Sequence, residues 1–481
     1  MKNLALVLAV AAVAVLQRTG RAGEPAPVVL PPASGTRAEP TFDALPEAKR
    51  KAIPIRLRRE SNEIPDSPFA TMGSPEVWRE SEDLDVVKAA RLLGVKHFVM
   101  HNLHGNVTDP KDPRLTRFFN ACKAARIEVR AILHSADLRL WESALRNWGG
   151  RITHWSYLNE PNMPQKNDHT NPMWTPQKYV TEIRAVRQLR DRVAPQVRLG
   201  GPDVAMLQVM EEKPFPWLRL CLEAGLAKEI DYFSFHPYRQ AYSPRNIPEY
   251  PSRFFGWGVM PKEYSTYEGQ IGALRRRVGD KPLVVDEVGW STTPKGSICE
   301  HTQAKFALRQ QIQDFALGVD VAVYFMLRER HVDAPHPLWH IENHFGIVHV
   351  DNTPKPAYTA LQALYAQIDG RDKPSKATVR LALSGLPPQM RGVEAKWYLF
   401  EDKADGTRTR KLLYWLPVTP QDEFPTVKAQ VRVGDVLVDD VPISDTPQIL
   451  RVHEIGGKWG WLVRIDLVLH QVDTKVAWRR G

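Results

Sequence analysis

Residues 151–161, RITHWSYLNEP, form a run rich in aromatic and β-branched residues that ends in polar residues and a proline. Such a run is typical of a buried strand and the start of its following loop. A helical pattern follows at 175–193, TPQKYVTEIRAVRQLRDRV, and a second strand-like run, VRLGGPD, at 197–203. A strand, a helix and a strand in succession predict two parallel strands joined by a crossover helix.

The same unit repeats from about residue 56 to residue 370. Eight such units over this length predict an α/β fold, the (β/α)8 TIM barrel. A doubly wound open sheet is the structural alternative, but no glycine-rich turn follows the first strand, as its nucleotide-binding form would require. The strand-like runs begin at Ser67, Val95, Glu128, Arg151, Val197, Asp231, Pro282 and Val321.

The pattern changes beyond residue 370. AKWYLFED at 395–402, RKLLYWLPV at 410–418 and KWGWLVRIDLVL at 458–469 alternate apolar and polar residues with period two. This alternation predicts a C-terminal antiparallel β-domain, resembling a sandwich, over 371–481. It carries no constellation of reactive residues, so we expect it to pack against the barrel, with sugar binding as the alternative.

The N-terminus has the features of an export signal. Lys2 precedes an apolar run of 13 residues, 4–16, which is shorter than the roughly 20 that span a bilayer. Small residues, Gly20 and Ala22, suit cleavage near residue 23. We therefore predict a signal peptide over 1–23, a proline-rich linker over 24–55 and a secreted or periplasmic protein, with an uncleaved anchor as the alternative.

Composition excludes several classes of protein. The 481 residues are 43% hydrophobic and 25% charged, as in a soluble globular protein. The formal charge of +10 either favours an acidic polymer or serves solubility. No basic block interleaved with aromatic residues indicates a nucleic-acid partner. Three cysteines without CxxC spacing indicate neither a zinc site nor a disulfide framework, and the oligomeric state stays open.

Two glutamates follow barrel strands. Glu160 ends the fourth strand in LNEP, and Glu287 ends the seventh in VVDEVGW. Because working residues of such barrels gather at the carboxyl ends of the strands, we expect both glutamates at one rim. Two carboxyl groups across one pocket are what cleavage of a glycosidic bond needs: one protonates the departing oxygen, and the other attacks or stabilises the anomeric carbon. NEP alone is a weak signal, since a strand-terminal glutamate is more often a solvated loop residue.

With its other motifs the sequence resembles the clan A retaining glycoside hydrolases over residues 56–370. NEP at 159–161 is similar to their acid/base signature, DEVGW at 286–290 to their nucleophile strand, and SFHPY at 234–238 to their sixth strand. FGIVHVDNTPKPAY, from Phe345, is also similar to the clan. Within the clan, the sequence looks closest to the branch around the β-xylosidase and iduronidase families and bacterial exopolysaccharide endoglycosidases.

The resemblance implies roles for individual residues. Glu160 would be the acid/base and Glu287 the nucleophile. Asn159 would hold the sugar 2-hydroxyl, Tyr238 would hydrogen-bond the nucleophile, and His236 would line the pocket. Two departures from the clan leave the sugar open: the eighth strand offers Tyr324 and Phe325 in place of a tryptophan, and the second ends in VMHN without the arginine often found near the nucleophile.

Two further rim residues are candidates from position alone. Trp290, in the loop after the seventh strand, either stacks on a sugar or packs in the core. His134 ends the third strand and is a candidate for the substrate pocket. Asp286 would point to the opposite side of its strand from Glu287, so we expect it to bond to neighbouring barrel residues.

The sequence also predicts the charge states of the two glutamates and the absence of a metal. We expect Glu287 to be ionised, kept so by Tyr238, and Glu160 to hold its proton to higher pH because that charge is near. Five histidines between 331 and 349 raise the alternative of a metal site, but Pro335 and Pro337 would break a helix that aligned them. No cofactor and no metal are therefore expected.

These patterns predict an exported, retaining β-glycoside hydrolase that cleaves an extracellular poly- or oligosaccharide by double displacement. The alternatives are a carbohydrate-binding or matrix protein on the same barrel, and a transglycosylase that uses the same glutamates. Hydrolysis of aryl glycosides distinguishes an enzyme from a binding module.

Overall fold

The computed structural model places every described residue in one compact unit. The predicted signal peptide, and the linker apart from residue 55, lie outside the described residues. None of the described helices is both long and apolar enough to cross a membrane. The described residues are 55–74, 79–101, 103, 108–165, 168–172, 174–205, 216–238, 247–250, 265–294, 296, 298–330, 340–404, 407–421, 424–425, 427–434, 436–455, 458–468, 471–473 and 479–480.

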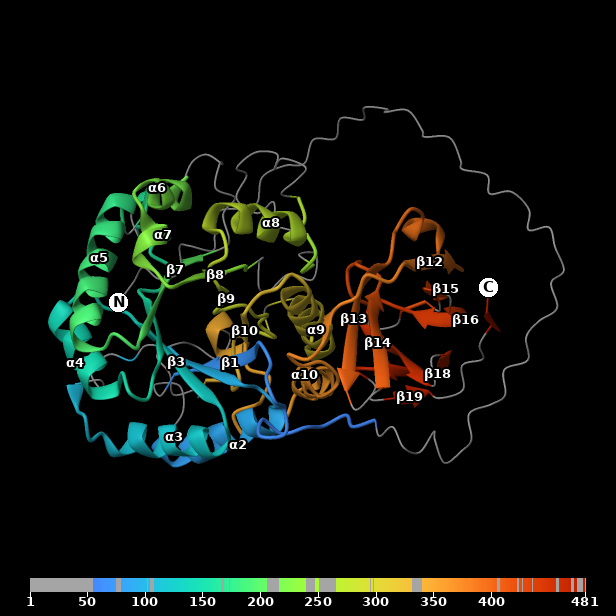
Figure 1. Cartoon of the computed structure of the whole chain (residues 1–481), viewed down its shortest axis with the longest axis horizontal. Helices are drawn as coiled ribbons and strands as arrows, with labels where there is room; N and C mark the ends of the chain where they lie inside the picture. The colour runs from blue at the N-terminus through green and yellow to red at the C-terminus, as the bar shows by residue number, and fades with distance from the viewer. Residues whose placement is uncertain are drawn as a thin grey trace. The chain divides into compact units, whose positions relative to one another are not determined.

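Eight parallel strands close into a barrel, in the order β1-β10-β9-β8-β7-β4-β3-β2 (Figure 1). All eight predicted strands are present, so the predicted TIM barrel is confirmed and an open sheet is excluded. The strands β5 (Pro164–Gln165) and β6 (Asp168–Pro172) form a separate hairpin in the loop after β4. The barrel strands are β1 (Phe69–Gly73), β2 (His97–Met100), β3 (Glu128–Leu133), β4 (His154–Tyr157), β7 (Arg198–Ala205), β8 (Tyr232–His236), β9 (Leu283–Val285) and β10 (Val321–Tyr324).

Helices connect the strands and begin at recognisable caps: Asp112, Thr175 and Thr266 each accept a hydrogen bond from a first-turn amide. Two short helices, α6 and α7, stand between β7 and β8, because Gly225 adopts φ 96° between them. The helices are α2 (Asp83–Leu93), α3 (Pro113–Ala124), α4 (Leu138–Trp148), α5 (Pro176–Val193), α6 (Trp217–Glu223), α7 (Leu226–Glu229), α8 (Tyr267–Val278), α9 (Glu300–Ala316) and α10 (Pro356–Gln367), with short 3-10 turns at Glu80–Glu82, Ile341–His344 and Pro388–Met390.

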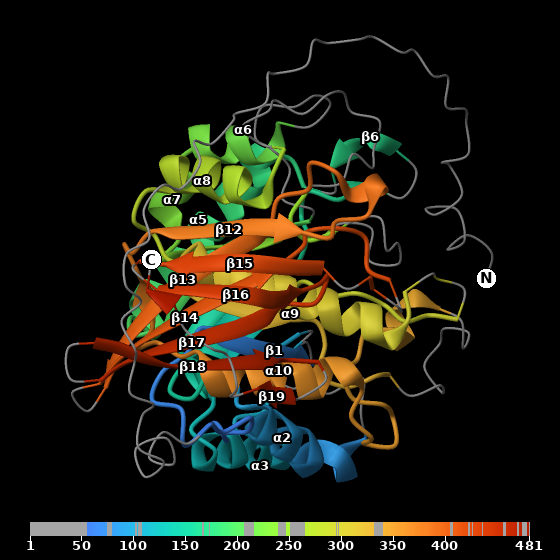
Figure 2. The ribbon, with the colours of Figure 1, turned by 90° about the vertical axis from the view of Figure 1, so that its right-hand side faces the viewer.

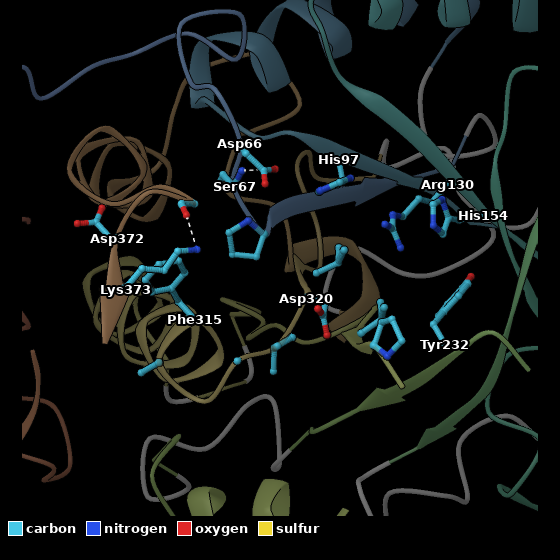
Figure 3. A pocket seen from close by; sticks show the side chains of 18 of the residues that line it. Asp66, Ser67, His97, Arg130, His154, Tyr232, Phe315, Asp320, Asp372 and Lys373 are labelled. Carbon is cyan, nitrogen blue, oxygen red and sulfur yellow. Dashed lines mark hydrogen bonds between the residues drawn. The ribbon is translucent and has the colours of Figure 1, made fainter. Parts of the chain in front are cut away.

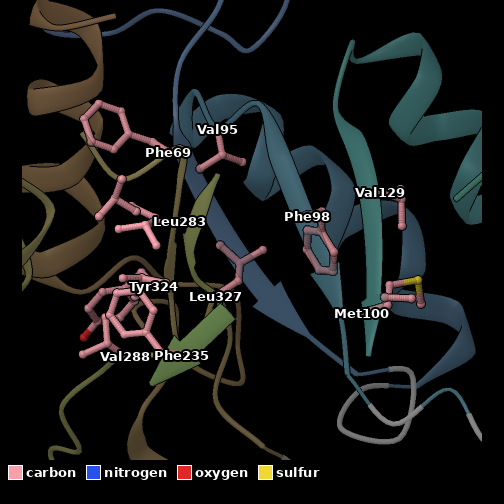
Figure 4. Packing of buried hydrophobic residues seen from close by; sticks show 14 of the residues in the cluster. Phe69, Val95, Phe98, Met100, Val129, Phe235, Leu283, Val288, Tyr324 and Leu327 are labelled. Atoms are coloured by element: carbon pink, nitrogen blue, oxygen red, sulfur yellow. The ribbon is translucent and has the colours of Figure 1, made fainter. Parts of the chain in front are cut away.

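A continuous hydrophobic core joins the barrel strands to their helices. On β1, Phe69 stacks on Tyr365 of α10, with ring centroids 4.2 Å apart. Phe98 of β2 meets Phe118 of α3 edge to face at 5.3 Å. Figure 4 shows Phe69, Leu283 and Tyr324 from three different strands or their ends packed in this cluster. This packing fixes the strand ends that carry the polar site.

Two antiparallel sheets follow the barrel, with the orders β11-β13-β14-β17-β18-β19 and β12-β15-β16-β20. Buried residues of both sheets share one cluster, among them Leu412 and Val438, so the predicted sandwich-like domain is confirmed. Figure 2 views it from the side of β12, β15 and β16. The strands are β11 (Lys373–Pro374), β12 (Val379–Ser384), β13 (Lys396–Ala404), β14 (Thr407–Trp415), β15 (Val427–Val433), β16 (Val436–Ile443), β17 (Gln448–Ile455), β18 (Lys458–Asp466), β19 (Gln471–Asp473) and β20 (Arg479–Arg480).

Buried charges on α9 join the barrel to the β-domain. The Lys305 ammonium lies 2.9 Å from Asp445. Arg309, fully buried, donates to the carbonyls of Val418 at 2.8 Å and Asp445 at 2.9 Å. Because a buried cation is tolerated only with such partners, these side chains are committed to the junction between α9 and the β-domain.

Candidate active site

Glu160 sits just beyond β4, where the backbone turns sharply. Leu158 and Glu160 have φ values of 60° and 47°, in the left-handed region that costs an L-residue roughly 1–2 kcal/mol. The Glu160 amide donates to the carbonyl of Asp203 at 3.1 Å, which ties the turn to β7. Strained backbone that its neighbours hold in place is common at functional sites.

Asn162 anchors the same turn from the other side. Its side-chain amide donates to the Ala205 carbonyl at 3.1 Å, and its oxygen accepts from the Ala205 amide at 2.8 Å. Asn162 is buried, with 4% of its surface exposed. The sequence analysis did not single it out. In the sequence it is only an asparagine two residues after the candidate glutamate. Its pairing with the Ala205 backbone is visible only in the folded structure.

Glu287 follows β9 and receives a hydrogen bond that the resemblance predicted. The Tyr238 hydroxyl, two residues beyond the end of β8, donates to Glu287 Oε1 at 2.8 Å. The Glu287 side chain is 12% exposed, against 24% for Glu160. Glu287 therefore lies deeper than Glu160 and has a fixed donor.

His236 brings the two glutamates together. Its Nδ1 lies 3.0 Å from Glu160 Oε1 and 3.9 Å from Glu287 Oε2. These two carboxyl oxygens are therefore at most 3.0 Å plus 3.9 Å, or 6.9 Å, apart. The expectation that both glutamates reach one rim agrees with this geometry, although they are 127 residues apart in the chain.

The charge states differ from those predicted. Burial raises the pKa of Glu287 to about 8, and Glu160 acts in the same direction, while His236 and Tyr238 oppose the rise. The expectation of an ionised Glu287 is therefore wrong for the ligand-free site at neutral pH. The cause is the depth of the Glu287 carboxyl, which sequence cannot show. Although burial opposes its charge, the acids around it, Glu287 and Asp286 first among them, raise the pKa of His236 well above its usual range.

A layer of buried acids lies beneath His236. Its Nε2 is 3.2 Å from Asp286 Oδ1, so Asp286 contacts a barrel neighbour, as its position on the strand predicted. Asp203 is fully buried and hydrogen-bonds Ser234. Burial and the adjacent Asp286 raise the pKa of Asp203 well above its usual range. This layer, with Asp203 unforeseen in sequence, orients the imidazole that contacts Glu160.

Two of the residues predicted to contact the substrate are buried in the structure. Trp290 is 1% exposed and packs on Phe306 of α9, with ring centroids 5.3 Å apart, so its indole face is not available to a sugar. His236 is fully buried and contacts carboxyl groups, so it positions the glutamates without lining the pocket surface. In each case the side chain turned inward from its strand end, which the sequence pattern could not distinguish from a rim position.

Asn159 and His134 remain partly exposed beside the site. The Asn159 side chain interacts with His101, which follows β2. The His134 ring lies 5.1 Å from that of His101, edge to face. Burial and the neighbouring imidazoles of His134 and His236 lower the pKa of His101 to about 3, so its ring is neutral. The predicted sugar contacts of Asn159 and His134 stay predictions.

A third carboxyl group, which the sequence analysis did not predict, acts on the pair. Glu342 lies in the 3-10 turn Ile341–His344 after β10, 3.7 Å from the Arg330 guanidinium. Its charge raises the pKa of Glu287 and that of Tyr238. Glu342 lies in the histidine-rich segment. There the sequence pattern raised the imidazoles as metal ligands and gave no role to this acid.

The histidine-rich segment does not form a metal centre in the part that can be described. Among the described residues, no group of three or more histidine, cysteine or acidic side chains could hold a metal ion. His331 and His336 lie outside the described residues. His344 and His349 instead flank Glu329, at 3.5 Å and 3.3 Å.

A comparison with protein families finds a match for part of the chain. The family described as "Glycosyl hydrolases family 39" matches residues 146–377, which include Glu160, His236, Tyr238 and Glu287. The barrel is that of a clan A glycoside hydrolase. Its activity is hydrolysis of O-glycosyl bonds, and its substrate is a carbohydrate. No curated protein matches the chain.

Solved glycoside hydrolases of similar architecture include a glucosidase from Croceicoccus marinus, with a TM-score of 0.48 and 16% identity over 79% of this chain and 82% of that one. A "GH39 enzyme" from Xanthomonas axonopodis pv. citri has a TM-score of 0.49 and 16% identity over 75% of this chain and 76% of that one. A monomeric β-xylosidase from Caulobacter crescentus has a TM-score of 0.48 and 13% identity over 75% of this chain and 76% of that one. At these values the likenesses carry no weight for the choice of sugar.

The raised pKa of Glu287 predicts how the rate of this glycoside hydrolase depends on pH. Cleavage needs one proton in the pair, to protonate the departing oxygen, and one carboxylate. As the pH rises through about 8, Glu287 loses the proton that the free site retains, and kcat/KM is expected to fall. A pH profile of kcat/KM from about pH 5 to 10 checks this; a plateau that continues past pH 9 would contradict it.

Two conservative variants should move that alkaline limb in opposite directions. Glu342→Gln removes a charge that raises the pKa of Glu287, so the limb should move to lower pH. Tyr238→Phe removes a hydrogen bond that lowers the same pKa, so the limb should move to higher pH. Shifts of the same sign in both variants would show that the limb does not report Glu287.

Proposed function

We propose that the chain is an exported, retaining hydrolase of β-glycosidic bonds in an extracellular poly- or oligosaccharide, with Glu287 as nucleophile and Glu160 as acid/base. The observation that carries the proposal is the upper limit of 6.9 Å, from 3.0 Å plus 3.9 Å, between an oxygen of each glutamate. Carboxyl groups about 5–5.5 Å apart act with retention, and those about 6.5–9.5 Å apart with inversion. The limit includes the retaining separation.

In the first step the Glu287 carboxylate attacks the anomeric carbon, while Glu160 gives its proton to the departing glycosidic oxygen. The shared proton must therefore lie on Glu160 when attack begins. Two groups favour the carboxylate of Glu287: the Tyr238 hydroxyl, which donates to it at 2.8 Å, and the His236 imidazole, whose Nδ1 lies 3.9 Å away. The positive charge that develops on the sugar ring in the transition state also stabilises the Glu287 carboxylate.

In the second step the glycosyl ester on Glu287 is hydrolysed. The ester is neutral, and Glu160, which gave up its proton in the first step, removes a proton from water. Water attacks the anomeric carbon, and the ester bond breaks to regenerate the Glu287 carboxylate. His236 contacts Glu160 at 3.0 Å in the free site and is itself held by Asp286, so Glu160 keeps its orientation through both steps.

Export rests on the sequence of the first 23 residues, where a short apolar run follows Lys2. A secreted or periplasmic enzyme would meet polymeric glycans outside the cytoplasm. Expression of the full chain, followed by fractionation and N-terminal sequencing of the mature protein, tests this part. A full-length chain that stays in the cytoplasm would contradict it without affecting the chemistry.

Proton NMR of the first-formed product tests retention. A panel of aryl β-glycosides identifies the accepted sugar, and the anomeric signals of the product are followed before mutarotation. The β-anomer should appear first. An α-anomer first would mean single displacement by water, and transfer to added sugar acceptors in preference to water would indicate a transglycosylase. Binding without any turnover would favour a carbohydrate-binding protein.

A further inference from the structure

A second cavity, of about 650 Å³, lies at the opposite end of the barrel from the glutamates. Its wall includes the first residues of four strands: His97 of β2, His154 of β4, Arg198 of β7 and Tyr232 of β8. Figure 3 shows the cavity from close by. Because Glu160 and Glu287 follow the carboxyl ends of their strands, this cavity is separate from the catalytic site.

Arg130, the third residue of β3, places a charge against this cavity and forms no ion pair with an acid in the described part of the chain. The residue is 9% exposed, and its Nε has no hydrogen-bond partner among the described residues. Its guanidinium lies 5.9 Å from the centre of the Tyr232 ring, and Figure 3 shows it pointing into the cavity. Burying a cation without a hydrogen-bonded partner costs several kcal/mol, so such a group marks a place for an anion.

The four acids that line the cavity already have hydrogen-bond or ion-pair partners, and Asp66 accepts from the Ser67 amide at 2.8 Å. Asp231 lies 2.7 Å from the Arg190 guanidinium. Asp320 accepts from the Leu283 amide at 2.8 Å, and Asp372 lies 2.8 Å from the Lys411 ammonium. The side chain of Arg198 has no ion pair within the described part of the chain.

Glu128, the acid whose charge acts on Arg130, is held by others. It lies 2.7 Å from His154 Nδ1 and 3.2 Å from His97 Nδ1, and it accepts from the Thr153 hydroxyl at 2.8 Å. Its carboxyl oxygens thus point to the histidines and the hydroxyl. The guanidinium of Arg130 keeps its donors for a group inside the cavity.

We propose that this cavity binds a small oxyanion, chelated by the guanidinium of Arg130 and attracted by Arg198. A planar guanidinium offers paired N–H donors that match two oxygens of a phosphate, a sulfate or a carboxylate. A free inorganic anion and the carboxylate of an acidic sugar share this chemistry. The site needs no part of the catalytic mechanism, so the two proposals stand or fall separately.

Calorimetric titration and thermal unfolding of the full chain test the site. Sodium phosphate is added at constant ionic strength, with sodium chloride as the reference, and glucuronate is titrated in a second arm. Phosphate should raise the unfolding temperature saturably beyond the effect of chloride. Glucuronate bound more tightly than phosphate would assign the site to acidic sugars, and the reverse order would assign it to inorganic oxyanions.

Variants locate the bound anion. Arg130→Gln should weaken phosphate binding about tenfold or more, a change of about 1.4 kcal/mol. Arg198→Gln, at an exposed position, should weaken it less while folding normally and keeping kcat/KM unchanged. Arg139→Gln, which removes the same charge from a side chain 94% exposed on α4, is the matched control and should bind like the parent. Binding that is absent in the parent, or undiminished in both Arg130→Gln and Arg198→Gln, would overturn the proposal.

Discussion

Glu287→Ala is expected to lower kcat on aryl β-glycosides by at least about 10⁴-fold, because no glycosyl ester can form without the nucleophile. Azide should restore part of the turnover, since a small anion fits the space left by the carboxylate and attacks the anomeric carbon itself. The product of rescue should be the α-glycosyl azide, as attack comes from the face that Glu287 occupied.

The parent enzyme and Glu142→Ala serve as controls for that experiment. Glu142 lies on the exposed face of α4, in an ion pair with Arg146. Neither control should respond to azide. Because Glu287 is buried, circular dichroism must first show that the Glu287→Ala chain is folded. The conservative variant Glu287→Gln should lose turnover to the same extent if the carboxylate itself is needed. Undiminished activity in both variants would end the assignment of Glu287.

Glu160→Ala is expected to separate substrates by their leaving groups. General acid catalysis contributes about 10²–10⁴-fold, so turnover of substrates with poor leaving groups should fall by that range. Substrates with activated leaving groups, such as dinitrophenol, need little protonation, and their first step should be nearly as fast as in the parent. The variant should also lose the alkaline limb of its pH profile on these substrates.

His236→Asn provides the comparison for Glu160→Ala. It keeps a polar side chain but removes the imidazole that contacts Glu160 at 3.0 Å and Asp286 at 3.2 Å. We expect a smaller loss of kcat that does not depend on the leaving group in the same graded way, because the acid is present but poorly oriented. An equal loss for all leaving groups in Glu160→Ala would contradict its role as the acid.

The barrel strands were predictable because each is an apolar run of β-branched and aromatic residues bounded by polar turns. Glu160 follows the fourth predicted strand and Glu287 the seventh. Both were therefore expected at the rim formed by the carboxyl ends of the strands. The eight predicted units imply a helix after the third strand, but its bounds were not predicted. In α4, Asp137 caps the helix, and Trp141, Leu145 and Trp148 form its buried face.

Charge states and side-chain orientation were beyond the sequence, because both depend on neighbours from other strands. The pKa of Glu287 depends on its depth and on Glu342, which follows β10. Trp290 and His236 looked like rim residues, but each turned inward at the end of its strand. The arginine against the second cavity, Arg130, lies within a strand whose sequence, EVRAILH, gives no sign of a cavity.

Trapping with a 2-deoxy-2-fluoro β-glycoside of the accepted sugar, followed by peptide mass mapping, tests the central claim most directly. The fluorine slows both steps and an activated leaving group restores the first, so the ester accumulates. The protein should gain the mass of one glycosyl group, on the peptide that contains Glu287. A label on another residue, or steady turnover of the parent substrate by a chain that never gains a label, would contradict the account.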